Sequence, residues 1–200
     1  ELSRLYNASG ILLASTPLDI RKLGLTIVDT VRTEFGQSNC SLLLTNEENQ
    51  QLERIAVSGP YADEVADSQA LWLDGPGLVP SAVRERKIIN VPDVTQREDY
   101  VSNWNDARSE MAIPLLVGEK AIGAIDVQSV KANAFNADDE RIVSVFAERA
   151  ALSLENTRLY QRQQRQLAFL ESLRQIDLAI TGSMNLDVML KVIARQVKSQ

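Results

Sequence analysis

The sequence predicts an α+β fold in which an antiparallel sheet carries its helices gathered on one face. Two hairpins are the main evidence. Strand-like runs at residues 111–117 and 121–128 are joined at Gly118, where glycine adopts a turn conformation that other residues resist. Similar runs at residues 40–45 and 52–57 are separated by a polar turn. Because the strands connect mainly as hairpins, an antiparallel sheet is favoured over a doubly wound parallel sheet.

A long helix is the third observation behind this fold class. We expect it to begin at Asn136, a good capping residue, with three carboxylates placed where the helix dipole favours negative charge. The apolar, alanine-rich pattern then runs past Tyr160 without a glycine or proline to stop it. A helix that extends beyond its own core indicates contact with another segment or molecule.

Shorter elements complete the expected fold. Residues 92–108 show little periodicity, although Tyr100 and Trp104 give this segment much aromatic surface. Pro114 cannot donate to a sheet, so we expect a bulge there or a position whose missing donor faces outward. The other expected elements are a helix from Leu18 to Phe35 that ends at Gly36, a strand at 71–73, a helix at 79–86 and a strand at 88–91.

Composition and charge exclude several classes of partner. A formal net charge of -6 makes non-specific capture of nucleic acid or anionic lipid unfavourable. The sequence has no apolar run long enough to cross a bilayer and no signal-peptide pattern. We therefore expect a cytoplasmic protein with no nucleic-acid partner and no direct membrane contact.

The cysteine and histidine content limits the chemistry. With one cysteine and no histidine, the chain cannot form an internal disulfide, and common zinc, haem and imidazole-base sites lose their usual ligand or base. Cys40 alternates with Leu42 and Leu44 on one face of a predicted strand, so we interpret it as a buried thiol. No metal site and no cofactor are identified.

A partial repeat suggests the domain organisation. Residues 1–6 recur in similar form at residues 155–160, and a Leu-Asp pair recurs downstream of each copy, after a spacer that is two heptads longer in the second copy. A two-heptad difference preserves the face of a coiled coil. Chance similarity of short helical segments is the alternative. The expected boundaries are a connector helix at 1–16, a central domain at 17–160, a coiled-coil connector at 161–180 and the start of a truncated second domain at 181–200.

The connector carries an apolar stripe that predicts dimerisation. A Gln/Arg-rich patch at residues 161–166 interrupts the stripe, so the dimer there is expected to be weak or adjustable, and a purely solvated surface is the alternative for this patch. We expect a homodimer through the N- and C-terminal helices. The stripe, called the seam below, consists of Leu152, Leu159, Phe169, Leu173, Ile176 and Ile180.

Several motifs taken in order resemble those of the GAF domain, a small-molecule sensor and dimerisation module common in bacterial signalling proteins. Their order is more specific than any single motif. The motifs are Gly77-Leu78-Val79 with the helix after it, residues 89–94, residues 108–115, residues 122–129, and Ala134-Phe135 with the long helix. The resemblance implies an antiparallel sheet with the terminal helices on one face and a pocket-forming layer on the other.

The same resemblance allows subclasses to be weighed. Cyclic-nucleotide-binding members carry an Asn-Lys pair where this chain has Ser129-Val130; Phe135, Asp139 and Glu140 match the rest of that pattern, but a helix start also explains them. Bilin- and haem-binding members use a histidine that is absent here, and related methionine sulfoxide reductases need a cysteine pair. The resemblance therefore implies an unknown small molecule as ligand, without haem, bilin or zinc.

Six residues are candidates for the pocket. The aromatic side chains could stack on a ring, and Arg108 could hold a carboxylate or phosphate. The structural alternative is that the aromatics cover the sheet and that Arg108 pairs with Asp93 or Glu110. The candidates are Trp72, Asp93, Tyr100, Trp104, Arg108 and Asp126.

Two functions remain open. The first is a regulatory sensor of a bacterial multidomain protein, whose output domain, a histidine kinase or a nucleotide cyclase, lies outside this chain. The second is a ligand-free dimerisation and spacer module with a vestigial pocket. A catalytic role is disfavoured, because nothing in the sequence joins Asp93 and Asp126 or supplies a nucleophile, base or metal constellation.

Overall fold

The computed structural model describes residues 19–34, 36, 38–60, 62, 70–97, 100–101 and 104–197, and the side chains of these as far as residue 178. The chain forms one antiparallel sheet with helices, so the predicted α+β fold class is confirmed. The expectation from the hairpin pattern that the helices gather on one face is wrong, because α4 (Leu78–Glu85) covers the opposite face, as the family resemblance implied. Its elements are α2 (Ile20–Glu34), β1 (Asn39–Asn46), β2 (Gln51–Ser58), β3 (Leu71–Trp72), α4 (Leu78–Glu85), β4 (Ile89–Val91), the 3-10 helix η1 (Val94–Gln96), β5 (Ser109–Val117), β6 (Lys120–Ser129) and α5 (Ala137–Val197).

The sheet joins the two predicted hairpins through their first and last strands. Its order is β3-β2-β1-β6-β5-β4, and every neighbouring pair is antiparallel. The contact between β1 and β6 places Ser41 opposite Asp126, although the two residues lie far apart in the sequence. Gly123 makes this approach possible, because an added Cβ would collide with the carbonyl oxygen of Leu43.

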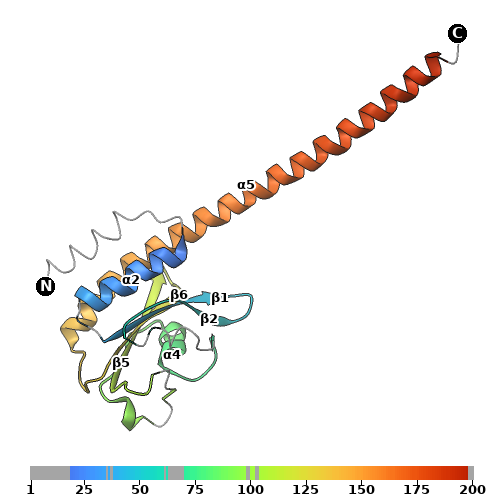
Figure 1. Ribbon diagram of the computed structural model, residues 1–200. Helices are drawn as coiled ribbons and strands as arrows, with labels where there is room; N and C mark the ends of the chain where they lie inside the picture. The colour runs from blue at the N-terminus through green and yellow to red at the C-terminus, as the bar shows by residue number, and fades with distance from the viewer. Residues whose placement is uncertain are drawn as a thin grey trace. The chain divides into compact units, whose positions relative to one another are not determined.

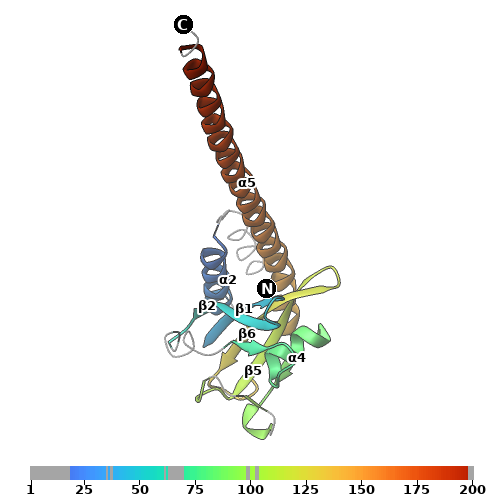
Figure 2. The ribbon, with the colours of Figure 1, turned by 90° about the vertical axis from the view of Figure 1, so that its right-hand side faces the viewer.

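One face of the sheet is covered by α2 and the first part of α5 (Figures 1 and 2). Helix α2 begins at Asp19, whose Oδ1 accepts the backbone N–H of Arg21 at 2.9 Å and thereby caps the helix. Gly24 packs so closely on the sheet that an added Cβ would lie 3.1 Å from Leu42. Side chains that are fully buried in this core include Leu23, Ile27, Leu42, Met111, Ile113, Ile125, Phe146 and Leu154.

The opposite face is covered by α4 and the segment between β4 and β5. In Figure 2, α4 lies on the side of the sheet away from α2 and α5. Helix α4 follows Gly77, whose φ of 111° favours glycine. A second apolar cluster joins this layer to the sheet and includes Leu43, Leu52, Leu78, Val79, Trp104, Ala112 and Ala124. The predicted layer opposite the terminal helices is therefore present.

Helix α5 starts with a reciprocal cap. The side chain of Asn136 accepts the backbone N–H groups of Asp138 and Asp139 at 2.8 and 3.1 Å, while Asp139 accepts the N–H of Asn136 at 2.9 Å. The helix is continuous to Val197. The chain divides into two compact units after Arg158, and the second unit contains the rest of α5.

Some expectations concern parts of the chain that lie outside this description. The predicted connector at 1–16, and with it one copy of the repeat, lies outside the described residues, as do the side chains of Ile180 and of residues 181–200. Pro114 stands opposite Ala124 in regular register, and the bulge falls one residue further on, between Leu115 and Leu116. Since β4 begins with Ile89 opposite Ala112, no described strand residue is paired with Pro114 on that side.

Candidate functional site

A group of buried polar side chains lies on the sheet face that α4 covers. Strand alternation places it there: Ile125 and Val127 pack in the core beneath α2 and α5, so Asp126 and Gln128 face the other way. Glu110 stands opposite Gln128 in the register of β5 and β6 and shares that face. The group, called the polar cluster below, consists of Asn39, Ser41, Arg54, Tyr100, Glu110, Asp126 and Gln128.

Glu110 is the acceptor at the centre of the polar cluster. Its Oε2 accepts the hydroxyl of Tyr100 at 2.6 Å and the side-chain N–H of Gln128 at 2.8 Å. Gln128 in turn accepts a hydrogen bond from the amide of Asn39 at 3.3 Å. Three strands and the segment before β5 therefore meet at one carboxyl group.

Glu110 and Asp126 form a pair of neighbouring carboxyl groups on β5 and β6. The residues are only 4% and 2% exposed. Burial raises the pKa of Glu110 and raises the pKa of Asp126 well above its usual range; for Asp126 the negative charge of Glu110 and a hydrogen bond to it add to the effect. The pair therefore favours holding a proton, because two ionised carboxylates offer hydrogen-bond acceptors only.

Arg54 and Tyr100 complete the electrostatics of the polar cluster. Burial lowers the pKa of Arg54, while the charges of Asp126 and Glu110 act to raise it. Burial raises the pKa of Tyr100, and the charge of Glu110 adds to this effect, so the phenol keeps its proton and donates it to Glu110. One guanidinium therefore faces one shared negative charge.

Three buried oxygen atoms of the polar cluster make no hydrogen bond in the structure: Oδ1 of Asp126, Oγ of Ser41 and Oδ1 of Asn39. Asp126 and Ser41 are direct cross-strand neighbours. A buried polar atom without a partner costs about 1–3 kcal/mol. The arrangement is thus suited to an additional polar group at this point of the sheet.

Three of the six candidate residues lie on this face. Asp126 and Tyr100 belong to the polar cluster, and Trp104, which is 3% exposed, packs in the adjoining apolar cluster. The carboxyl group of Asp126 bonds to Glu110, not to that of Asp93. Trp72 lies on the edge strand β3 and is 57% exposed.

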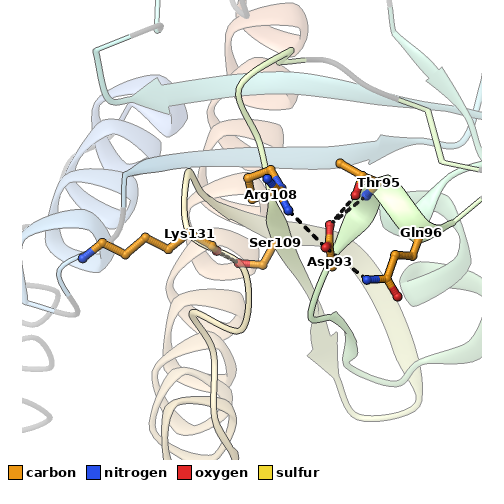
Figure 3. A network of polar contacts seen from close by, with 6 residues as sticks. All are labelled: Asp93, Thr95, Gln96, Arg108, Ser109 and Lys131. Atoms are coloured by element: carbon orange, nitrogen blue, oxygen red, sulfur yellow. Dashed lines mark hydrogen bonds and ion pairs between the residues drawn. The ribbon is translucent and has the colours of Figure 1, made fainter.

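Asp93 and Arg108 form a separate network near the surface (Figure 3). Arg108 Nη2 lies 3.2 Å from Asp93 Oδ2, and the arginine side chain is 49% exposed. Asp93 also accepts the hydroxyl of Thr95 at 2.7 Å and the side-chain amide of Gln96 at 3.2 Å. These bonds, that of Thr95 first and that of Arg108 next, lower the pKa of Asp93 to about 2. Arg108 thus pairs with Asp93, as the structural alternative expects.

Cys40 lies on the other side of the sheet from the polar cluster. It belongs to the core beneath α2 and α5 and is fully buried. Burial raises the pKa of its thiol, and the nearby carboxylates of Asp126 and Asp29 add to this. The prediction of a buried structural thiol agrees with this position, and the thiol is not presented to the polar cluster.

Five members of the polar cluster were not predicted from the sequence. Glu110 and Gln128 could have been found, because each is a polar residue at an alternate position of a strand whose other positions are apolar. Ser41, Arg54 and Asn39 leave a weaker signal, since only the pairing of β1 with β2 and β6 brings them to the carboxyl groups.

Among the described residues there is no group of three or more acidic, cysteine or histidine side chains that could hold a metal ion. The helices of the described part include none that is long and apolar enough to cross a membrane.

Two sequence comparisons relate this chain to GAF domains. Residues 17–155 match the family model of the GAF domain. The GAF domain-containing protein A of Dictyostelium discoideum is 31% identical over 70 residues, which are 35% of this chain and 44% of that protein. The chain thus spans less than half the length of that relative.

Solved structures show the same fold at low sequence identity. The GAF domain of a phosphoenolpyruvate-protein phosphotransferase from Coxiella burnetii superposes with a TM-score of 0.72 at 18% identity, covering 80% of this chain and 95% of that one. The corresponding domain from Acinetobacter superposes with a TM-score of 0.70 at 19% sequence identity. The superposition covers 79% of this chain and 94% of that one. Free methionine-R-sulfoxide reductase from Neisseria meningitidis, solved with its substrate, superposes with a TM-score of 0.69 at 20% sequence identity. The superposition covers 78% of this chain and 89% of that one.

Proposed function

We propose, since this chain belongs to the GAF domain family, that it is a regulatory sensor domain that binds a small molecule against the polar cluster and relays binding through its helices. The observation that carries the proposal is the pair of buried, unbonded oxygen atoms of Asp126 and Ser41. A wholly apolar, filled face would instead favour a vestigial pocket. Here the face combines an apolar wall with convergent polar groups, as ligand sites commonly do.

Two hydrogen bonds support a relay from the polar cluster to the helices. Strand β2, which carries Arg54, is tied to α2 because Arg32 donates to the hydroxyl of Ser58 at 2.8 Å. Strand β1, which carries Ser41, is tied to α5 because Arg158 donates to the carbonyl oxygen of Thr45 at 2.8 Å. A ligand that displaces side chains on β1 or β2 would therefore act on strands that are bonded to both helices.

A regulatory role is preferred to a catalytic one for this chain. The Neisseria relative is a reductase, but the reduction of a sulfoxide by thiols requires reactive sulfur at the substrate. This chain has one cysteine, and its thiol lies in the core on the opposite face of the sheet. We place the domain in a multidomain bacterial signalling protein with a kinase or cyclase output.

A ligand screen tests the proposed function. Thermal unfolding of the 200-residue chain is measured with nucleotides, amino acids and organic acids, together with the variants Asp126→Asn and Asp106→Asn. A ligand present at about 100 times its Kd stabilises the fold by about 2.7 kcal/mol, which raises Tm by about 5 to 10 °C for a chain of this size. We expect at least one such rise, lost in Asp126→Asn and kept in Asp106→Asn, whose carboxyl group is exposed. Flat curves with every compound would contradict the proposal.

Dimerisation through α5 is a second function, and it has an observation of its own. Leu159, Phe169, Leu173 and Ile176 are 55%, 63%, 47% and 55% exposed along the second unit. Apolar side chains at coiled-coil spacing on an exposed helix favour pairing with another helix. We propose that the second copy of this chain supplies it.

A further inference from the structure

The arrangement of Glu110 and Asp126 restricts the chemistry of the ligand. The two residues occupy neighbouring strands, with Glu110 opposite Gln128 and Asp126 opposite Ala112, so their side chains project diagonally across one face. Both are more than nine-tenths buried. Two ionised carboxylates offer acceptors only, so two carboxyl groups this close together and this deeply buried favour a shared proton.

The unbonded oxygen atoms of the polar cluster are best satisfied by a ligand that donates hydrogen bonds. Oδ1 of Asp126 is an acceptor without a donor, and the neighbouring hydroxyl of Ser41 also makes no bond. Glu110 already accepts from Tyr100 and Gln128 through one oxygen, Oε2. An ammonium group is compact and carries donors only, so it can satisfy Asp126 and Ser41 together.

The net charge of the polar cluster also favours an ammonium group as ligand. When the carboxyl pair holds a proton, its single negative charge is offset by the guanidinium of Arg54, which interacts with both acids. A buried site pays a large desolvation cost for any net charge. If an ammonium group enters and the shared proton leaves, the net charge of the polar cluster does not change. An anionic group entering the same place would leave an excess negative charge.

We propose that the ligand of this site carries an ammonium group, and that this group takes the place of the proton shared by Asp126 and Glu110. The proton passes to the buffer, and both carboxylates are then ionised against the ammonium and Arg54. This inference rests on the proposed function, since it requires a ligand at the polar cluster. It adds that binding releases a proton and strengthens as pH rises.

The described titratable groups around the acid pair lie on several neighbouring elements, and Arg54 and Tyr100 face the pair. Strand β2 contributes Arg54 and the segment before β5 contributes Tyr100, which keeps its proton. Cys40 of β1 lies across the sheet from Asp126 and interacts with it electrostatically. In α4, Arg84 is held by the carbonyl oxygens of Leu73 and Gly75. The acid pair is therefore the group whose proton can be exchanged for a cation.

Matched pairs of compounds test the inference on the complete 200-residue chain. Ethanolamine differs from ethylene glycol, and alanine from lactate, in that one ammonium group replaces one hydroxyl group; putrescine carries two ammonium groups where butane-1,4-diol has two hydroxyl groups. We expect one or more ammonium compounds to raise Tm while their hydroxyl partners do not. Titration calorimetry of that compound, in two buffers of different ionisation enthalpy near pH 7, should show about one proton released, and affinity should rise about tenfold per pH unit below the titration of the pair.

Variants separate the exchange from general effects on folding. Asp126→Asn keeps the size of the side chain and its donor to Glu110 but has no proton to release. Calorimetry of this variant should therefore show no proton release, and its affinity for the ammonium compound should fall at least about tenfold. Glu110→Gln should have the same two effects. Asp106→Asn should behave as wild type. Melting curves without ligand establish that each variant is folded.

Three results would overturn the inference. They are equal binding of a hydroxyl partner, ammonium binding without proton release, and flat curves for the whole set of pairs. If nucleotides or organic acids bind in an Asp126-dependent way while these pairs stay flat, the ammonium chemistry is wrong and the proposed function stands. If every compound in both screens is flat, both fail.

Discussion

The residue that most distinguishes this sheet is Asp126, an acid at a fully buried position of a central strand. An isolated buried carboxylate would be strongly destabilising, and burial beside Glu110 raises the pKa of Asp126, which favours its neutral form. The arrangement costs stability compared with an apolar residue of similar size. This cost, at a point where buried oxygen atoms lack partners, is the physical reason for proposing a ligand site here.

The raised pKa of Asp126 predicts how stability depends on pH. The folded chain holds this proton to higher pH than the unfolded chain, so the free energy of unfolding should fall as pH rises above the ordinary carboxyl range of about 4. Asp126→Asn removes this loss. In urea unfolding between pH 5 and pH 9, the stability of the variant relative to wild type should increase with pH. A difference that does not change with pH would show that Asp126 titrates normally.

Asp93 should show the opposite dependence. Its pKa of about 2 in the folded chain lies below the unfolded value, so its contribution to stability is present above the ordinary carboxyl range and is lost as pH falls through about 2. The stability difference between wild type and Asp93→Asn should therefore be constant from pH 6 to about pH 4 and shrink towards pH 2. A constant difference down to pH 2 would contradict the network of Thr95 and Arg108.

Sequence patterns found only part of the candidate site. Asp126, Tyr100 and Trp104 stood out by residue type, an acid in an apolar strand and aromatics in an irregular segment. Arg54 and Ser41 did not, because their role depends on the pairing of β1 with β2 and with β6. Asp93 and Arg108 stood out by type as well, yet local hydrogen bonds join them to each other near the surface.

The individual elements were the most predictable level of the structure. Both hairpins lie within one or two residues of their predicted bounds, because period-two alternation and turn residues are local signals. The helices α2 and α4 also match closely, since Asp19 and Gly77 mark their starts. Strand β3 is shorter than its pattern suggests. Alternation patterns, turn residues and helix caps therefore predict the bounds of individual helices and strands, but they do not show which strands pair.

The cap of α5 gives a prediction for a single element. Asn136→Ala removes the acceptor for two backbone N–H groups at the helix start and should cost about 1 kcal/mol of stability. Asn156→Ala is the matched control, because this asparagine is exposed inside the same helix, where alanine has the better helix propensity. Urea unfolding measures both. Equal effects of the two substitutions would contradict a capping role for Asn136.

The pairing of β1 with β6 defines the whole molecule. It closes the two hairpins into one sheet, buries the polar cluster, and brings Gly123 against Leu43. No local sequence pattern predicts the pairing of β1 with β6, because the two strands come from opposite ends of the domain. The resemblance to the GAF family implied the layers, and the family match confirms the assignment over residues 17–155.

Oligomerisation is the prediction that belongs to the whole molecule. Leu173→Glu places a charge on the seam and should shift the chain from dimer to monomer by about tenfold or more in dissociation constant, because the seam loses apolar contacts. Leu178→Glu is the control, since Leu178 is similarly exposed, 56% against 47%, but lies off the seam. Sedimentation equilibrium distinguishes the two variants. A wild-type chain that is monomeric, or equal effects of both substitutions, would contradict dimerisation through the seam.

The central claim, that a small molecule binds at the polar cluster, is tested most directly by the indole N–H signals of the two tryptophans. Trp104 is buried in the apolar cluster beside the polar cluster, whereas Trp72 is exposed on the edge strand β3. In ¹H–¹⁵N spectra, assigned with Trp72→Phe, a stabilising compound should shift the signals of Trp104 and of the Gln128 side-chain amide, and leave Trp72 in place. If Trp72 alone moves, or if Trp104 and Gln128 stay fixed with every compound that stabilises the fold, binding occurs elsewhere and the account is wrong.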